Sequence, residues 1–293
     1  MKPAPFTYAA PSTVADALDE LAAHGEAARA LAGGQSLVPL LALRMARVER
    51  LVDLNRIDAL TGIEEHDGAL RIGAMTRQST LERDALVRRA APLISEATRL
   101  VGHAPLRNRG TIGGSLVHAD PAAEYPAVAV TLDAEVEVAS ASGGTRRVAY
   151  DEMLRSAYMT ALEPDELAVA VHVPAAAPRS GSAIEEIARR PGDFALAGAC
   201  AMLSLDGEDR IAHARVVVFG VGPRAVRLTA VEDGLVGERA ADAAVDTLCA
   251  EATAGLRPPS DVQADGAYRK SAARVVSTRV VARALSRALE GVT

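Results

Sequence analysis

Two pairs of glycines, each followed within two residues by a serine, are the part of this sequence best suited to binding a phosphate. The first glycine segment, residues 32–36, reads AGGQS, and the second glycine segment, residues 111–115, reads TIGGS. Glycine has no Cβ, so backbone N–H groups can converge on an anion, and a neighbouring hydroxyl adds a donor. Each hydrogen bond to a charged phosphate contributes about 1.5–3 kcal/mol. Either segment alone is more simply a tight turn, but two in one domain match the two phosphates of a diphosphate.

The catalytic motifs of most self-contained enzymes are missing from the sequence. It has no Gly-x-Gly-x-x-Gly after its first predicted strand and no Gly-Lys-Ser/Thr loop for a nucleoside triphosphate. Its six histidines form no His-x-x-x-His pair, and there is no Gly-x-Ser-x-Gly elbow. The two cysteines, Cys200 and Cys249, are too few for the four thiolates of a [2Fe–2S] cluster or of a Cys₄ zinc site. A hydrolase or metalloenzyme complete in itself is therefore not expected.

Composition narrows the class of protein further. The 293 residues suffice for about two domains. Lys and Arg number 32 against 38 Asp and Glu, and aromatic residues make up 3%, so the chain is a poor candidate for nucleic-acid binding. It contains no run of 18 uncharged apolar residues, and its first residues lack a long apolar signal core. We expect a cytoplasmic protein with no transmembrane segment.

The elements predicted before the second glycine segment place the first one at the end of a strand. Helical spacing of apolar residues favours a helix over 12–24, and a short buried strand over 28–32 leads into the first glycine segment. A second strand is expected over 51–54. Residues 62–73 form two strands joined at Asp67-Gly68, a strong hairpin signal. A helical region follows from 76 to about 101, with a possible restart at Pro92.

After the second glycine segment, the pattern indicates hairpins followed by helices. A strand over 135–139 turns back through Ser142-Gly143-Gly144, and a weakly alternating strand covers 167–173. Residues 174–182 are rich in Ala, Pro and Ser and are the best linker candidate. Further along the chain, we expect strands over 195–205 and 211–221 across Asp206-Gly207, then helices over about 225–237 and 239–254 and a last helix from about 267. This irregular alternation favours an α+β fold over a doubly wound parallel sheet.

With both glycine segments placed, the sequence resembles the FAD-binding medium subunit of the molybdenum hydroxylases. This family includes the carbon monoxide dehydrogenase medium subunit and the flavin domain of xanthine dehydrogenase. The similarity covers nearly the whole chain in order, and the first two motifs are specific in combination. The matching segments are AGGQSLVP at 32–39, RNRGTIGGS at 107–115, HADPAAE at 118–124, RRPGDFALA at 189–197, GVGP at 220–223 and SDVQA at 260–264.

The resemblance implies a fold and a set of cofactor contacts. It implies a two-lobed PCMH-type FAD-binding domain over 1–176, with lobes of about 1–56 and 57–176, and a smaller α/β C-terminal domain over 182–293, an antiparallel sheet plus helices. The glycine segments would hold the FAD diphosphate, Val101 would lie near the flavin or adenine, and Asp120 and Glu124 near ribityl or ribose hydroxyls. The cofactor-binding residues implied are Leu31, Ala32, Gly33, Gly34, Gln35, Ser36, Val101, Thr111, Ile112, Gly113, Gly114, Ser115, Asp120 and Glu124.

The resemblance also implies partners. A large subunit would carry the molybdenum cofactor and a small subunit two [2Fe–2S] clusters, in a dimer of heterotrimers, with FAD passing electrons to an external acceptor. The xanthine dehydrogenase branch has a lysine near the flavin, but this chain has Ile-Glu-Glu at 184–186. A cationic partner for reduced flavin therefore does not carry over. Alternatives are a free-standing FAD-dependent oxidoreductase of the same fold, resembling the enolpyruvyl reductase of cell-wall synthesis, or a scaffold that has lost the cofactor.

Several residues near the motifs have more than one reading. Arg107 and Arg109 either neutralise phosphate or form a solvated basic pair. Asp120 either contacts the cofactor or caps a helix beginning at Pro121, and the two roles can coexist. Tyr125 and Tyr158 either stack on flavin or, more commonly for tyrosine, pack in a core. The cluster at 189–193 forms either an interface or a local ion pair, and Cys200 reads as a small buried hydrophobe.

Overall fold

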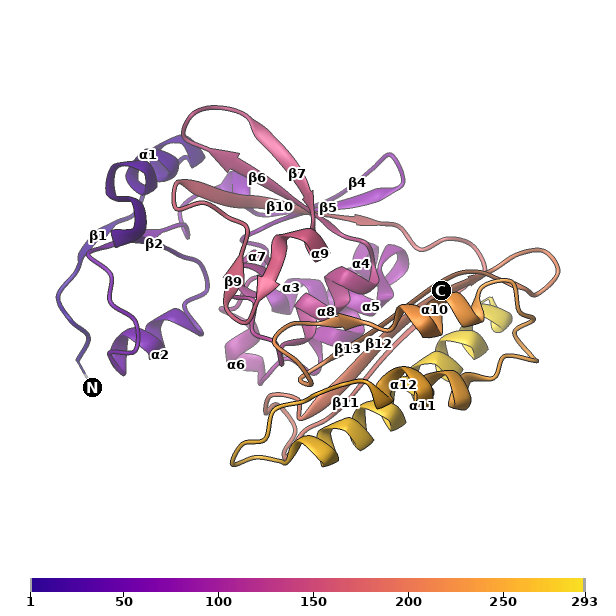
Figure 1. The fold of residues 1–293 in the computed structure, drawn as a ribbon. Coiled ribbons are helices and arrows are strands. Elements are labelled where there is room, and N and C mark those ends of the chain that lie inside the picture. The colour runs from indigo at the N-terminus through magenta and orange to yellow at the C-terminus, as the bar shows by residue number, and fades with distance from the viewer. Residues whose placement is uncertain (1, 292–293) are drawn as a thin grey trace.

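The computed structural model describes residues 2–291, and it begins with a small lobe built on three parallel strands (Figure 1). Strand β3 lies between β1 and β2, and helix α1 packs beside them. The 3₁₀ turns η1 (Gly25–Ala27) and η2 (Asp58–Leu60) lie before β2 and after β3. The elements of this first lobe are β1 (Thr7–Ala9), α1 (Val14–His24), β2 (Ala28–Leu31), α2 (Leu37–Ala42) and β3 (Arg50–Asp53).

Helix α1 follows its predicted pattern closely. Thr13 is its N-cap, with its hydroxyl accepting a hydrogen bond from the Asp16 N–H at 3.1 Å. Ala17, Leu18 and Leu21 form its buried face. This face anchors the strand that leads to the first glycine segment.

The second lobe is a five-stranded antiparallel sheet in the order β4-β5-β10-β6-β7. The hairpin predicted at Asp67-Gly68 is confirmed, since both residues adopt positive φ between β4 and β5. The long strand β10 occupies the centre of the sheet and pairs with β5 and β6. The strands are β4 (Ile63–His66), β5 (Ala69–Gly73), β6 (Glu135–Ser140), β7 (Thr145–Ala149) and β10 (Glu166–Pro174), with a small separate pair β8 (Leu154–Ser156) and β9 (Met159–Thr160).

Short helices of the second lobe pack between this sheet and the C-terminal part of the chain. Pro92 starts a helix, as its position predicted. The second glycine segment is not a loop, because α7 begins at Ile112 and includes both glycines. No helix begins at Pro121, since α8 begins only at Glu124. The helices are α3 (Gln78–Arg83), α4 (Ala85–Ala90), α5 (Pro92–Thr98), α6 (Ala104–Arg107), α7 (Ile112–His118), α8 (Glu124–Thr131) and α9 (Tyr150–Met153).

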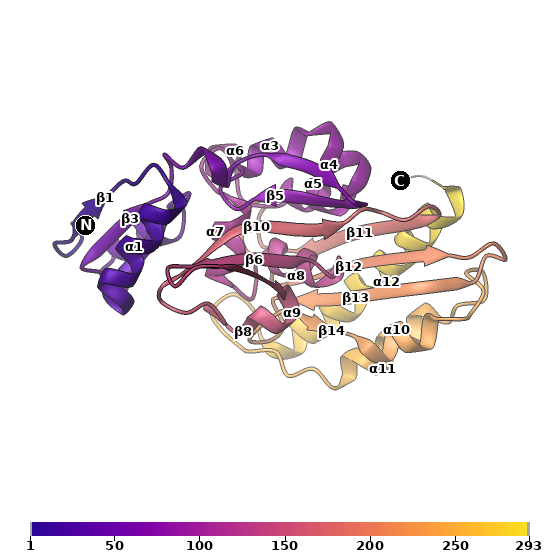
Figure 2. The same ribbon diagram turned by 90° about the horizontal axis from the view of Figure 1, so that it is seen from above.

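The C-terminal part is a four-stranded antiparallel sheet in sequence order, with the long helix α12 along one face (Figure 2). The turn predicted at Asp206-Gly207 joins β12 to β13. The helix expected over 225–237 is shorter, because 226–227 pair as β14. The elements are β11 (Ser180–Ile187), β12 (Ala197–Leu205), β13 (Ile211–Phe219), β14 (Val226–Arg227), α10 (Thr229–Leu235), α11 (Val245–Ala254) and α12 (Gly266–Glu290).

One apolar core joins the second lobe to the C-terminal sheet. It contains Ile184, Cys200, Val217 and Phe219 of that sheet together with side chains of the second lobe. Cys200 is completely buried there, which confirms its reading as a small hydrophobe. A second core lies between the same sheet and α12. Within residues 2–291, no helix combines the length and apolar character needed to cross a bilayer.

Candidate functional site

The two glycine segments lie against each other, although some 75 residues separate them in sequence. A Cβ placed on Gly33 would lie 2.3 Å from the Arg109 carbonyl oxygen and 2.8 Å from the Gly110 Cα. A Cβ placed on Gly114 would lie 3.2 Å from the Cβ of Ala32. Only glycine permits this approach of the two backbones. The fold therefore brings the two segments into one site.

The first glycine segment presents unpaired backbone donors. It follows β2 directly, and Gly34 takes φ of +74°, which lets the chain turn. The side chain of Gln35 donates from Nε2 to the Gly33 carbonyl at 3.0 Å, and this bond braces the turn. Within residues 2–291, none of the backbone N–H groups of 32–36 donates a hydrogen bond to the protein. Successive free N–H groups in such a turn form a concave anion-binding surface.

The second glycine segment has four of its five backbone amides already paired within the protein, and it carries two hydroxyls. Thr111 is the N-cap of α7, and its Oγ1 accepts from the Gly114 N–H at 3.1 Å. The N–H groups of 112, 113 and 115 donate to the carbonyls of Thr76, Ala74 and Thr111. Its remaining donors are the N–H of Thr111 and the hydroxyls of Thr111 and Ser115. The positive end of the α7 dipole adds to the favourable field for an anion.

Leu31 lies against the first glycine segment, whereas the described contact of Val101 is with Arg107. A Cβ on Gly34 would meet the Cδ1 of Leu31 at 3.3 Å, so Leu31 supports the turn of the first segment. Val101 follows α5, and its carbonyl accepts from Nη1 of Arg107 at 3.1 Å. Arg107 also donates from Nε to Glu82 at 3.0 Å, so it forms a local ion pair rather than a solvated basic pair with Arg109.

Asp120 lies just beyond the C-terminal end of α7, a helix of seven residues that is about 10 Å long at 1.5 Å per residue. Its Oδ1 accepts from the Ala122 N–H at 2.9 Å, so it closes a turn and does not cap a helix at Pro121. Its Oδ2 accepts from the Tyr158 hydroxyl at 3.2 Å. The Tyr158 ring lies 5.2 Å from that of His118 and is 61% exposed.

A buried carboxyl group, that of Glu124, and a half-buried one, that of Glu186, influence each other near the N-terminus of α8. Glu124 is the first residue of that helix, and burial raises its pKa to about 7. Burial and the proximity of Glu124 raise the pKa of Glu186 to about 8. Glu186 lies on the same face of β11 as Ile184, toward the second lobe, because alternate residues of a strand share a face. Its buried Oε2 has no hydrogen-bond partner within the described residues.

The sequence did not single out Glu186, and Tyr125 takes its commoner role. Alternation along 180–187 was the available signal, since it places a glutamate on the face that also carries Ile184. Tyr125 is buried, and its hydroxyl shares a 2.7 Å hydrogen bond with the Thr98 hydroxyl, so it packs in the core. Arg189 donates to Gln263 at 3.2 Å, a local contact inside the chain.

Comparison with known protein families identifies the family to which this chain belongs. The family described as the FAD binding domain in molybdopterin dehydrogenase matches residues 4–176. The chain belongs to the FAD-binding medium subunits of the molybdenum hydroxylases. The CO dehydrogenase flavoprotein C-terminal domain matches residues 182–284. The resemblance seen in the motifs is therefore confirmed, together with the α+β fold and the antiparallel C-terminal sheet.

Relatives of this medium-subunit family align over nearly the full chain. The 6-hydroxypseudooxynicotine dehydrogenase complex subunit alpha of Paenarthrobacter nicotinovorans is 40% identical over 98% of this chain and 97% of its own length. The carbon monoxide dehydrogenase medium chain of Hydrogenophaga pseudoflava is 36% identical over 98% of both. The solved H. pseudoflava enzyme superposes with a TM-score of 0.94, at 36% identity over 98% and 99% of the two chains. Quinoline 2-oxidoreductase from Pseudomonas putida 86 gives 0.92, at 37% identity over 99% and 100%.

The residues present fit FAD. A dinucleotide needs donors for two phosphates and polar groups for its hydroxyls. The free N–H groups of 32–36 supply the first, beside the hydroxyls of Thr111 and Ser115. Asp120, just beyond the other end of α7, and Glu124, at the start of α8, carry polar groups of the second kind. The chain is thus the FAD-binding subunit of an oxidoreductase.

Proposed function

We propose that this chain carries electrons between a partner's [2Fe–2S] clusters and an external acceptor through its bound FAD. A large molybdenum-cofactor subunit and a small iron–sulfur subunit are the proposed partners, in a dimer of heterotrimers. Relatives named as a medium chain and as one subunit of a complex support this assignment. FAD, when bound, supplies the conversion between two-electron and one-electron transfer, and the protein supplies binding and orientation.

The five unpaired N–H groups of residues 32–36 carry the proposal. Buried or half-buried amides without a partner are costly, and four of these five residues are buried or half-buried, so the turn is suited to bind an anion. In the proposed complex these amides bind the diphosphate, and Thr111 and Ser115 donate from their hydroxyls. Leu31 and Val101 line the site, while Asp120 and Glu124 bind ribityl or ribose hydroxyls.

The division of the chain into binding and C-terminal domains is also a proposal. We place the boundary in the linker between β10 and β11, with 1–176 binding FAD and 182–293 as the C-terminal domain. The first lobe would end near 56 and the second would run from 57 to 176. Matches of two separate families on either side of residues 177–181 support this division.

Amide hydrogen exchange on the full chain tests the diphosphate site directly. Without FAD, the amides of 32–36 should exchange rapidly, because they have no acceptor. Saturation with FAD should slow them by at least tenfold, while the amides of 112–115, already bonded in the protein, should change little. Unchanged exchange at 32–36 in a chain with bound FAD would refute the assignment of that segment.

Isolation of the assembly tests the electron route. We expect a large and a small chain to co-purify with this one, carrying molybdenum and iron, and its flavin to be reduced only through them. Substrate turnover by this chain alone would favour the free-standing oxidoreductase instead. Purified protein without releasable flavin would exclude both.

A further inference from the structure

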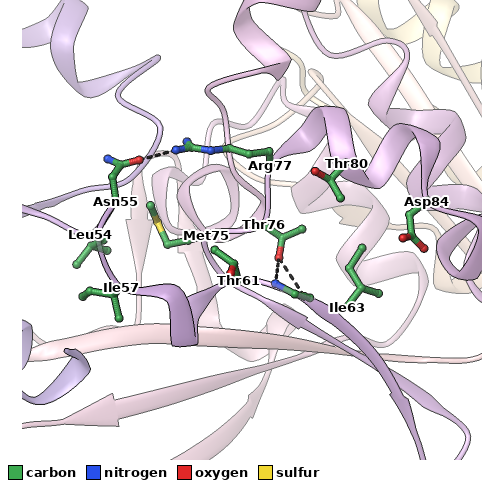
Figure 3. Close-up of a pocket in the computed structure, with 11 residues that line it drawn as sticks. Leu54, Asn55, Ile57, Thr61, Ile63, Met75, Thr76, Arg77, Thr80 and Asp84 are labelled. Carbon is green, nitrogen blue, oxygen red and sulfur yellow. Dashed lines mark hydrogen bonds between the residues drawn. The ribbon is translucent and has the colours of Figure 1, made fainter. Parts of the chain in front are cut away.

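We propose that Asn55 and Arg77 form a bridge that sets the separation of the two glycine segments and thereby selects a diphosphate over a monophosphate. This inference rests on the proposed binding of the FAD diphosphate at those segments. Asn55 follows β3 in the first lobe, and Arg77 precedes α3 in the second (Figure 3). We call this pair the Asn55–Arg77 bridge.

The bridge runs from the backbone of one segment to the backbone beside the other. Asn55 donates from Nδ2 to the carbonyl of Ala32 at 3.0 Å, inside the first segment. Arg77 donates from Nη2 to the Oδ1 of Asn55 at 2.6 Å, as Figure 3 shows. The other guanidinium nitrogen, Nη1, donates to the carbonyl of Arg109, two residues before the second segment. Three hydrogen bonds, made by two side chains, therefore link the segments across the two lobes.

Further hydrogen bonds within each lobe fix the positions of Asn55 and Arg77. The Asn55 N–H donates to Oδ1 of Asp53 at 2.9 Å, and Oδ2 of Asp53 accepts from the Tyr8 hydroxyl. On the other side, the backbone of Arg77 pairs with that of Thr111 in an isolated β-bridge. A guanidinium presents its donors in a rigid planar fork, so it can fix the distance between two acceptors. The separation of the segments is therefore set before any ligand binds.

Arg77 also brings a positive charge that no salt bridge neutralises within the described residues. Arg107 is also half-buried and near the second segment, but it is paired with Glu82. Burial, with Arg109 nearby, lowers the pKa of Arg77, and Asp53 is the carboxylate that offsets this. Positive charge left beside the segments favours an anion between them.

A cavity of about 310 Å³ lies beside the bridge, but its polar side chains other than Thr80 are already paired. The Thr76 hydroxyl donates to the Gly62 carbonyl at 3.0 Å, and Asp84 caps α4 through Leu86 and Val87. Ligand recognition therefore falls to the segments, and Arg77 is a positioning residue.

Ligand discrimination tests the bridge. The full chain is freed of flavin and titrated with FAD, ADP and AMP. Arg77→Gln should weaken FAD and ADP by at least tenfold and AMP by less than threefold, because only a diphosphate needs both segments at their set spacing. Arg77→Lys keeps the charge without the fork, so it should lose most of the ADP preference as well. Asn55→Ala combined with Arg77→Gln should be no worse than the worse single variant.

Arg89→Gln is the matched control, because its exposed ion pair with Glu65 touches neither segment. It should leave all three affinities unchanged. An ADP-to-AMP ratio in folded Arg77→Gln equal to that of the unchanged chain would overturn the bridge, as would full rescue by lysine. Failure of the unchanged chain to bind FAD would instead overturn the proposed function.

Discussion

Replacing Gly33 with alanine should separate the two glycine segments by a distance that the structure fixes. The added Cβ would lie 2.3 Å from the Arg109 carbonyl oxygen, whereas ordinary contact begins near 3.4 Å. Both neighbours are backbone atoms, so the segments themselves must move by about 1 Å. A hydrogen bond of 2.9 Å to a ligand spanning them then stretches to nearly 4 Å, beyond hydrogen-bonding range.

The expected loss follows from one such bond. A hydrogen bond to a charged group contributes about 1.5–3 kcal/mol, which corresponds to about a 10- to 150-fold rise in the Kd for FAD. Fluorescence titration of the flavin-free chain measures it, with circular dichroism to show that the variant is folded. Gly207→Ala is the control, since a Cβ at that turn position meets no atom within 4 Å. A folded Gly33→Ala chain that binds FAD as tightly as Gly207→Ala would refute the contact between the segments as a requirement for binding.

Three further changes have outcomes that the structure specifies. Gly114→Val should yield protein without flavin, because the Cβ of the valine would lie 2.8 Å from the Thr111 Oγ1 that caps α7. Flavin is measured by absorbance after denaturation, and full flavin content would contradict this prediction. Glu124 has its pKa raised by burial from 4.5 to about 7, so its ionisation lowers the unfolding free energy as pH rises through that range. Glu124→Gln should therefore reduce the fall in Tm between pH 5 and pH 8, and an unchanged fall would contradict the role of burial. Arg269→Met should leave the buried carbonyls of Leu196 and Gly220 unpaired. The unfolding free energy measured in urea should fall by about 1–3 kcal/mol for each of them. Wild-type stability would show that water replaces the guanidinium.

Local chemistry explains what the sequence predicted well. The hairpin at Asp67-Gly68 and the helix start at Pro92 depend on backbone preferences of the residues themselves. The Thr13 cap of α1 is also local, because its hydroxyl accepts from the N–H of a residue only three positions further on. The first glycine segment was also predictable, because a strand leading into a glycine pair needs no distant partner to form its turn.

The errors arose where a distant group competes for the same backbone. The second glycine segment reads as a loop, but the carbonyls of Thr76 and Ala74 accept from its amides and Thr111 caps it, so it forms the first turn of a helix. Of the two roles open to Asp120, the helix cap before Pro121 is wrong, because its carboxylate accepts from the Ala122 N–H in a local turn and from the Tyr158 hydroxyl. Thr76, Ala74 and Tyr158 lie tens of residues away from the groups that they contact, and periodicity contains no information about them.

Strand β10 explains why the glycine segments hold a fixed relation across two lobes. Leu167 and Val169 pack into the core of the first lobe, together with α1, while Ala168 and Val171 pack into the core of the second. The register shift between Ala168 and Ala170 lets one strand serve both cores, and burial on two faces accounts for its weak alternation. The lobes therefore cannot move independently without exposing apolar surface. FAD would meet a site whose spacing is already set, and its binding energy need not be spent on bringing the lobes together.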